Sequence, residues 1–123
     1  MVAFSDPLAI GKITTVEGSI SIQRADQTIQ LSAGDFIYLD DVVNSGQTAV
    51  GIAFADETTM SVDPNSTMVI DDFVYDPENP TTGSMNANIL EGNFSFVSGQ
   101  IAKAGNDAMK VTTPVLTIGV RGT

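Results

Sequence analysis

Residues 49–70 read AVGIAFADETTMSVDPNSTMVI, and this stretch decides the fold. Apolar side chains alternate with small or polar ones, first around Ile52 and then around Met60. Two acidic turns, 56–57 and 63–66, interrupt the alternation. Apolar residues at a period of two, separated by Asp, Pro and Asn, are typical of strands with one buried face. The stretch therefore predicts three short strands, and the alternation does not fit a helix.

Similar patterns extend in both directions along the chain. Turn signals recur every few residues, and they separate further predicted strands at 12–16, 19–24, 28–31, 36–38, 42–43, 73–75, 93–97, 110–113 and 115–120. Residues 76–86 are rich in Pro, Gly, Asp and Asn and predict a surface loop, whereas 85–90 fit a strand or a single helical turn. About ten or more short strands predict an all-β fold, either a single-domain β-sandwich or roll or a short β-solenoid.

A length of 123 residues fits one domain. Residues 1–10 are expected to be a lead-in segment, and 11–123 are expected to form the β domain, cut from a longer chain. The apolar residues on the predicted buried faces give the expected core: Ile20, Ile22, Leu31, Ile37, Val43, Ile52, Phe54, Met60, Val62, Ile70, Phe94, Phe96, Val111 and Ile118.

The composition excludes several classes of function. The formal net charge is −10, and the five Lys and Arg residues are scattered, so nucleic acid and anionic membranes are poor partners. There is no Cys and no His, which removes disulfides, thiolate metal sites and His-dependent catalysis. No apolar run reaches the ~20 residues of a transmembrane helix, so membrane insertion is not expected. No pair of acidic residues is placed by a hydrolase motif, and the protein is expected not to be an enzyme.

The acidic turns make calcium a possible ligand. Calcium binds six to eight oxygen ligands, and Asp63, Asn65, Asp71 and Asp72 are the first candidates because a strand pair could bring them together. The alternative is that these residues only cap turns and face solvent. No cofactor is expected beyond this possible calcium ion.

Arg121 lies in an otherwise apolar segment near the end of the sequence. It is a candidate partner contact, and the alternative is a structural ion pair with one of the many carboxylates.

One segment of the chain echoes another. Residues 16–22 and 90–96 both read apolar-Glu-Gly-small-apolar-Ser-apolar. Two copies are too few for a repeat protein. The echo predicts two strands that enter the core with similar bends, with Gly18 and Gly92 supplying the backbone freedom.

A set of ordered motifs resembles the FecR-type domain, which is named for the ferric-citrate regulator of bacterial envelopes. The resemblance covers about residues 11–123, and its motifs are Gly18-x-Ile20-x-Ile22, Leu31-x-x-Gly34-Asp35, Asp41-x-Val43-x-Ser45-Gly46, Phe54-Ala55-Asp56-Glu57-Thr58-Thr59, Leu90-Glu91-Gly92, Phe96-Val97-Ser98-Gly99, Thr113-Pro114 and Ile118-Gly119-Val120-Arg121-Gly122-Thr123. The family's Asp-Gly-Thr turn is altered here to Asp56-Glu57-Thr58. A Glu is less comfortable than Gly in a turn that needs positive φ.

The resemblance implies an extracytoplasmic all-β module, located in the periplasm, on the cell surface or in a secreted protein. Its expected function is that of a non-enzymatic protein-interaction module at the start of a larger bacterial surface protein. The alternatives are a signal-sensing domain of a sigma-factor regulator and a calcium- or carbohydrate-binding adhesin module. The expected partners are other protein domains of the envelope or of the same chain, with possible self-association through the C-terminal strand, residues 111–123.

Overall fold

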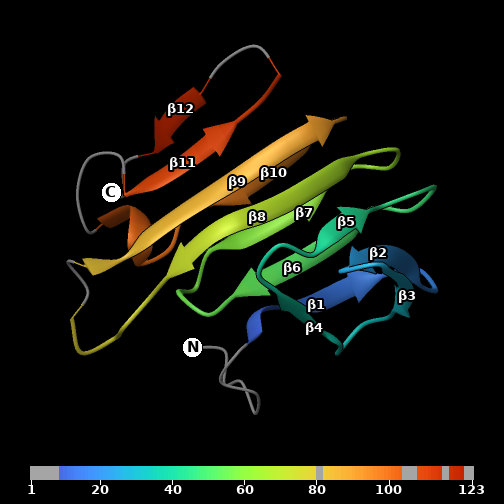
Figure 1. Cartoon of the computed structure of the whole chain (residues 1–123), viewed down its shortest axis with the longest axis horizontal. Coiled ribbons are helices and arrows are strands. Elements are labelled where there is room, and N and C mark those ends of the chain that lie inside the picture. The colour runs from blue at the N-terminus through green and yellow to red at the C-terminus, as the bar shows by residue number, and fades with distance from the viewer. Residues whose placement is uncertain (1–8, 80–81, 104–107, 115–116, 121–123) are drawn as a thin grey trace.

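Two β-sheets build the protein, as a computed structural model shows for residues 9–79, 82–103, 108–114 and 117–120 (Figure 1). The strands are β1 (Ala9–Val16), β2 (Ile20–Arg24), β3 (Gln27–Leu31), β4 (Phe36–Tyr38), β5 (Val42–Asn44), β6 (Val50–Phe54), β7 (Thr59–Val62), β8 (Thr67–Val74), β9 (Ser84–Glu91), β10 (Phe94–Val97), β11 (Met109–Thr112) and β12 (Thr117–Val120). A short 3-10 turn, η2 (Ile101–Lys103), precedes β11. No helix in these ranges is long and apolar enough to span a membrane.

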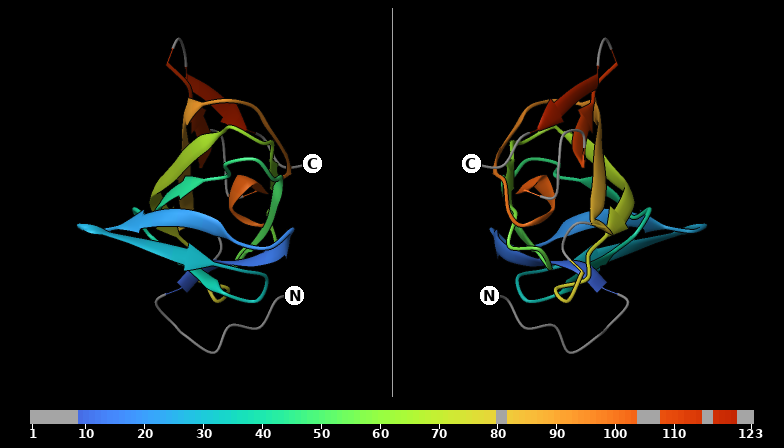
Figure 2. Two further views of the ribbon diagram at one scale, coloured as in Figure 1. Left: turned by 90° about the vertical axis from the view of Figure 1, so that its right-hand side faces the viewer. Right: turned by 90° about the vertical axis from the view of Figure 1, so that its left-hand side faces the viewer.

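The chain passes repeatedly between the two sheets. The five-stranded sheet has the order β10-β7-β6-β1-β4, and the seven-stranded sheet has the order β12-β11-β9-β8-β5-β2-β3. The described strand pairs are antiparallel except for β9 and β11, which are parallel. Between these two strands the chain crosses to the other sheet, where it forms β10. In the end-on views of Figure 2 the strands surround the interior and η2 lies inside their ring. The predicted all-β, sandwich-like fold is confirmed.

The inner faces of both sheets form one hydrophobic core. The alternation in residues 49–70 works as predicted, because β6, β7 and the start of β8 turn every second apolar side chain inward. The predicted core residues that the structure buries are Ile20, Ile22, Leu31, Ile37, Val43, Ile52, Phe54, Met60, Val62, Ile70 and Val111. Unpredicted members come mainly from β1, β9 and η2: Ile10, Ile13, Met85, Ala87, Ile89, Ile101 and Ala102.

Three expectations about the core and its boundaries need correction or fall outside the structure. Phe94 and Phe96 are only half-buried, because β10 lies at the end of its sheet and has a neighbour on one side. β1 begins at Ala9, so the last two residues of the predicted lead-in are buried strand residues. The side chain of Ile118 lies outside the described part of the chain.

The echoed Glu-Gly segments are the corners where the chain changes sheets. Gly18 joins β1 of the smaller sheet to β2 of the larger one, and Gly92 joins β9 of the larger sheet to β10 of the smaller one. Both glycines have positive φ, +80° and +89°, which only Gly adopts without strain. A Cβ at Gly92 would also lie 2.6 Å from the Cα of Ser66. The predicted similar bends are therefore confirmed.

A buried carboxylate ties the turn between β6 and β7 to the segment that follows β10. Asp56 and Thr58 are both fully buried. The Asp56 carboxylate accepts hydrogen bonds from the Thr58 N–H (3.0 Å), the Thr58 hydroxyl (2.8 Å) and the Ile101 N–H (3.0 Å). The Thr58 hydroxyl in turn accepts the Gly99 N–H (3.0 Å), and the Gln100 N–H donates to the Asp56 carbonyl (2.7 Å). We call these contacts the Asp56 clamp.

The clamp leaves no space at Gly99. A Cβ there would collide with the Asp56 carbonyl oxygen and the Thr58 nitrogen, and would lie 2.6 Å from the Glu57 carbonyl carbon. These atoms are backbone and cannot rotate away, so the close approach requires Gly at this position.

We expect Gly99→Ala to lower the free energy of unfolding by about 3 kcal/mol, because the added methyl group must push two backbone segments apart. Chemical denaturation followed by circular dichroism measures this. The neighbouring Ser98→Ala is the control and should change stability by less than about 0.5 kcal/mol. Equal stabilities of the two variants would show that the contact at Gly99 is not tight.

Glu57 occupies a backbone conformation that suits Gly, with φ of +76°. We expect Glu57→Gly to raise the free energy of unfolding by about 1 kcal/mol through relief of this strain. The lost side chain makes only a long contact with Gln100, 3.4 Å and exposed. Glu57→Gln keeps the Cβ and should leave stability unchanged. A Gly variant no more stable than the Gln variant would contradict the strain argument.

Candidate functional site

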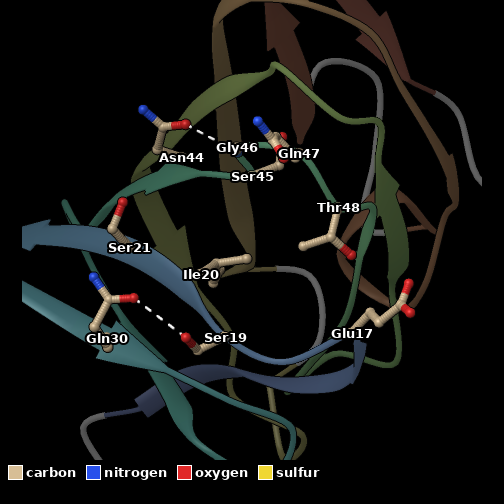
Figure 3. A pocket seen from close by; sticks show the side chains of 10 residues that line it. All are labelled: Glu17, Ser19, Ile20, Ser21, Gln30, Asn44, Ser45, Gly46, Gln47 and Thr48. Carbon is tan, nitrogen blue, oxygen red and sulfur yellow. Dashed lines mark hydrogen bonds between the residues drawn. The ribbon is translucent and has the colours of Figure 1, made fainter.

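A polar hollow of about 430 Å³ lies where the first corner meets the turn after β5 (Figure 3). Its walls come from the β1–β2 corner, from β2 and β3, and from the turn that leads into β6. The lining residues are Glu17, Ser19, Ile20, Ser21, Gln30, Asn44, Ser45, Gly46, Gln47 and Thr48. Hydroxyl and amide groups dominate the lining, and Glu17 is its only charged side chain.

Part of this lining is held in place by internal hydrogen bonds. The Ser45 hydroxyl is buried, donates to the Asp63 carbonyl (2.7 Å) and accepts the Ser66 N–H (2.9 Å). The Ser19 hydroxyl donates to the Gln30 side-chain oxygen at 3.3 Å. The Gly46 N–H donates to the Asn44 side-chain oxygen at 3.1 Å. The base of the hollow is therefore rigid on one side, where the β5–β6 turn is fixed to the β7–β8 turn.

Other lining groups keep free hydrogen-bonding capacity. Within the described residues, the side chains of Glu17, Ser21 and Gln47 make no hydrogen bond. Together they offer one carboxylate, one hydroxyl and one amide to a ligand. Such a set can bind polar groups such as peptide amides or hydroxyls, but it contains no nucleophile paired with a base.

An aromatic hollow of about 500 Å³ lies at another part of the surface. Its lining comprises Ala9, Ile10, Tyr38, Leu39, Ala55, Phe73 and Tyr75. Desolvation raises the pKa of Tyr75 above its usual value, and the nearby carboxylates of Glu57, Asp56 and Asp76 raise it further. The hydroxyl of Tyr75 therefore stays protonated throughout the physiological pH range.

One ion pair supports the edge of this aromatic hollow. Arg24, at the end of β2, donates from Nε and Nη2 to the two carboxylate oxygens of Asp41 at 3.0 and 2.8 Å. The Asp41 side chain is 1% exposed and also accepts the Tyr38 N–H at 2.9 Å. The guanidinium carbon lies 4.6 Å from the Tyr38 ring centroid. The hydrogen bond to Asp41 raises the pKa of Arg24, so the guanidinium stays charged.

The four candidate calcium ligands occupy two separate places. Asp63 and Asn65 are exposed in the turn between β7 and β8. Asp71 and Asp72 lie within β8, roughly 20 Å further along at the rise of an extended strand. They line another hollow, in which Asp71 accepts the Asn86 amide at 2.7 Å. The described residues contain no cluster of three acidic groups that could hold a metal ion, and calcium binding stays a prediction for each place.

The remaining candidate, Arg121, lies outside the described residues. Sequence reasoning also missed the polar hollow, because its residues come from three separate segments, 17–21, Gln30 and 44–48. One signal was present in the sequence: the polar run 44–48 directly follows a predicted short strand, 42–43.

The Arg24–Asp41 pair can be tested against its exposed neighbour. We expect Asp41→Asn to lower the free energy of unfolding by about 2 kcal/mol, because it removes a charged acceptor of three hydrogen bonds beside a partly exposed Arg. Asp40→Asn, a similar change at an exposed position with φ of +67°, should change it by less than about 0.5 kcal/mol. Thermal and urea unfolding measure both, and an equal effect at the two positions would argue against the pair.

Comparison with known proteins agrees with the ordered motifs. The family model described as FecR protein matches residues 40–123, which is more than half of the chain. This range contains the Asp56 clamp and the corner at Gly92. No curated protein and no solved structure matches the chain. By its family match and its motifs, the chain belongs to the FecR family.

Proposed function

We propose that the protein is a non-enzymatic, extracytoplasmic interaction module of a larger bacterial surface or secreted protein, and that it binds another protein domain through the polar hollow. The observation that carries the proposal is the unpaired set of Glu17, Ser21 and Gln47 around a hollow whose base is fixed on one side by Ser45. A rigid base beneath free hydrogen-bonding groups favours polar recognition over chemistry, since preorganised groups lose little entropy on binding.

The lining also argues for binding rather than catalysis. Glu17 is its one titratable side chain, and the chain contains no His or Cys. General acid–base catalysis is performed most often by His, and a weak nucleophile such as a Ser hydroxyl has to be activated, commonly by an adjacent base; the lining offers neither a His nor such a pair. A hydrogen-bonding surface needs no such pair.

Family membership favours a second candidate, a domain that receives a signal for a regulator. The FecR family is associated with regulation at the bacterial envelope, and the family-matched range includes one wall of the hollow, residues 44–48. The two candidates differ in what the hollow binds: a receptor domain from another protein in a regulator, or a neighbouring domain in a surface protein.

Site-specific photo-crosslinking tests the proposal in the full-length protein in its own cells. A photoreactive residue at position 47 should crosslink to another protein or to another domain of the same chain. The matched control is position 23, an exposed Gln of β2 that does not line the hollow. Glu17→Ala should weaken the product from position 47 several-fold. Identical products from positions 47 and 23 would contradict binding at the hollow.

Protease accessibility tests the location separately. The protein should be digested when protease reaches the periplasm or the cell surface while a cytoplasmic marker stays intact. Protection of both would place the protein in the cytoplasm and overturn the extracytoplasmic part of the proposal.

A further inference from the structure

β10 is the end strand of the five-stranded sheet, with β7 on one side only. Its residues pair in antiparallel register with β7, so that Phe94 lies opposite Val62, Ser95 opposite Ser61 and Phe96 opposite Met60. No described strand lies on its other side, which forms an edge of the sheet.

The register shows which backbone groups this edge presents. The Asp63 N–H donates to the Asn93 carbonyl at 3.0 Å, so the polar backbone groups of Asn93 point toward β7. These directions alternate along an antiparallel strand. The N–H and C=O of Ser95 therefore also point toward β7, and those of Phe94 and Phe96 point away from it. No described residue bonds these outward groups.

Nothing in β10 protects its edge. Natural edge strands usually carry charges or Pro, which block pairing with another strand. Residues 93–98 read NFSFVS and contain neither. Val97 is 69% exposed, more than any other large apolar residue in the described ranges. Three other described strands end a sheet: β4 has only three residues, and β3 exposes mainly Gln and Thr between Asp26 and Asp35. The third, β12, has Gly119 among its four residues, and a glycine weakens a strand.

We propose that a second copy of this chain pairs with β10 in antiparallel orientation around a two-fold axis at Ser95. The Phe-Ser-Phe segment, 94–96, reads the same in both directions, so a two-fold axis matches it with itself. This register places Phe94 of one copy opposite Phe96 of the other. It uses the outward N–H and C=O of both residues in each copy. Ser95 then faces its own counterpart in a close, non-hydrogen-bonded pair, which a small side chain fits.

Size and charge make this association weak and dependent on salt. Four residues per strand form a small interface, well below that of a stable dimer. Each copy carries a net charge of −10, so the copies repel each other at low ionic strength. Added salt should therefore strengthen the pairing, whereas it would weaken binding that depends on opposite charges.

Sedimentation equilibrium from roughly 10 µM to 1 mM, in low and high NaCl, measures the association. We expect dimers at the upper concentrations, with a larger fraction at high salt. Ser95→Lys should weaken dimerisation at least tenfold, because two Lys side chains would face each other across the axis. Ser61→Lys is the control, since Ser61 is exposed on the same face and pairs with Ser95 one strand inward. It makes the same change in net charge and should leave dimerisation within twofold of the original.

A disulfide variant keeps the test valid if the Lys variant fails to fold. The chain has no Cys, so Ser95→Cys introduces a single thiol. Opposed Cα atoms in a non-hydrogen-bonded antiparallel pair are about 4.5 Å apart, which a disulfide can span. Ser95→Cys should form covalent dimers on mild oxidation, and Ser61→Cys should not, because its counterpart lies about 14 Å away in the proposed dimer, three strand spacings. A monomer at 1 mM in both salts, or equal crosslinking of the two variants, would overturn the proposal.

Discussion

The Asp56 clamp is the constraint on which the rest of the fold depends. A carboxylate removed from water costs free energy unless hydrogen bonds replace its hydration, and Asp56 obtains them from one hydroxyl and two backbone N–H groups. One donor, the Ile101 N–H, comes from a segment more than forty residues further along the chain. The clamp thereby holds η2 against the β6–β7 turn, and Ile101 and Ala102 enter the core there. These hydrogen bonds, together with the Gly99 N–H bond to Thr58, fix the position of η2 against the turn.

The two corners allow a short chain to form a sheet on each side of one core. Successive strands change sheets several times, and each sharp change needs a backbone that an L side chain tolerates poorly. Gly18 and Gly92 meet this need at equivalent points of the echoed segments. The echo therefore reflects a shared local geometry and not a repeated domain. At Gly92 the corner is also close to Ser66, whose hydroxyl donates to the Asn93 carbonyl and accepts the Asn93 N–H.

The sequence predicted strands far better than their pairing. Alternation in residues 49–70 identifies inward side chains, because burial on one face requires it. It does not say which strands are neighbours, and so the parallel pairing of β9 with β11 was not expected. The same limit explains the half-buried Phe94 and Phe96, which look like core residues until the strand is seen to end its sheet. Asp71 and Asp72 fall between two predicted strands, the last one of 49–70 and 73–75, yet β8 continues through them where its register with β9 shifts. The extended β8 strand therefore separates Asp71 and Asp72 from Asp63 and Asn65, the other two candidate calcium ligands. The period of two in a sequence shows which face of a strand a residue occupies, but only the strand boundaries and their register show how far apart two residues lie.

Two surfaces in the described part of the chain carry the proposed contacts, and each keeps unused hydrogen-bonding groups. One is the polar hollow, built by the β1–β2 corner, β2, β3 and the β5–β6 turn, and the other is the edge of β10. They share no residue, and their chemistry differs: the hollow presents side chains, whereas the edge presents backbone groups of Phe94 and Phe96. Pairing at β10 would therefore leave the hollow of each copy open. A two-fold dimer would present two hollows in a fixed arrangement, and bivalent contact with a clustered partner raises the apparent affinity without any new contact. Weak self-association would then couple binding at the hollow to the local density of the protein.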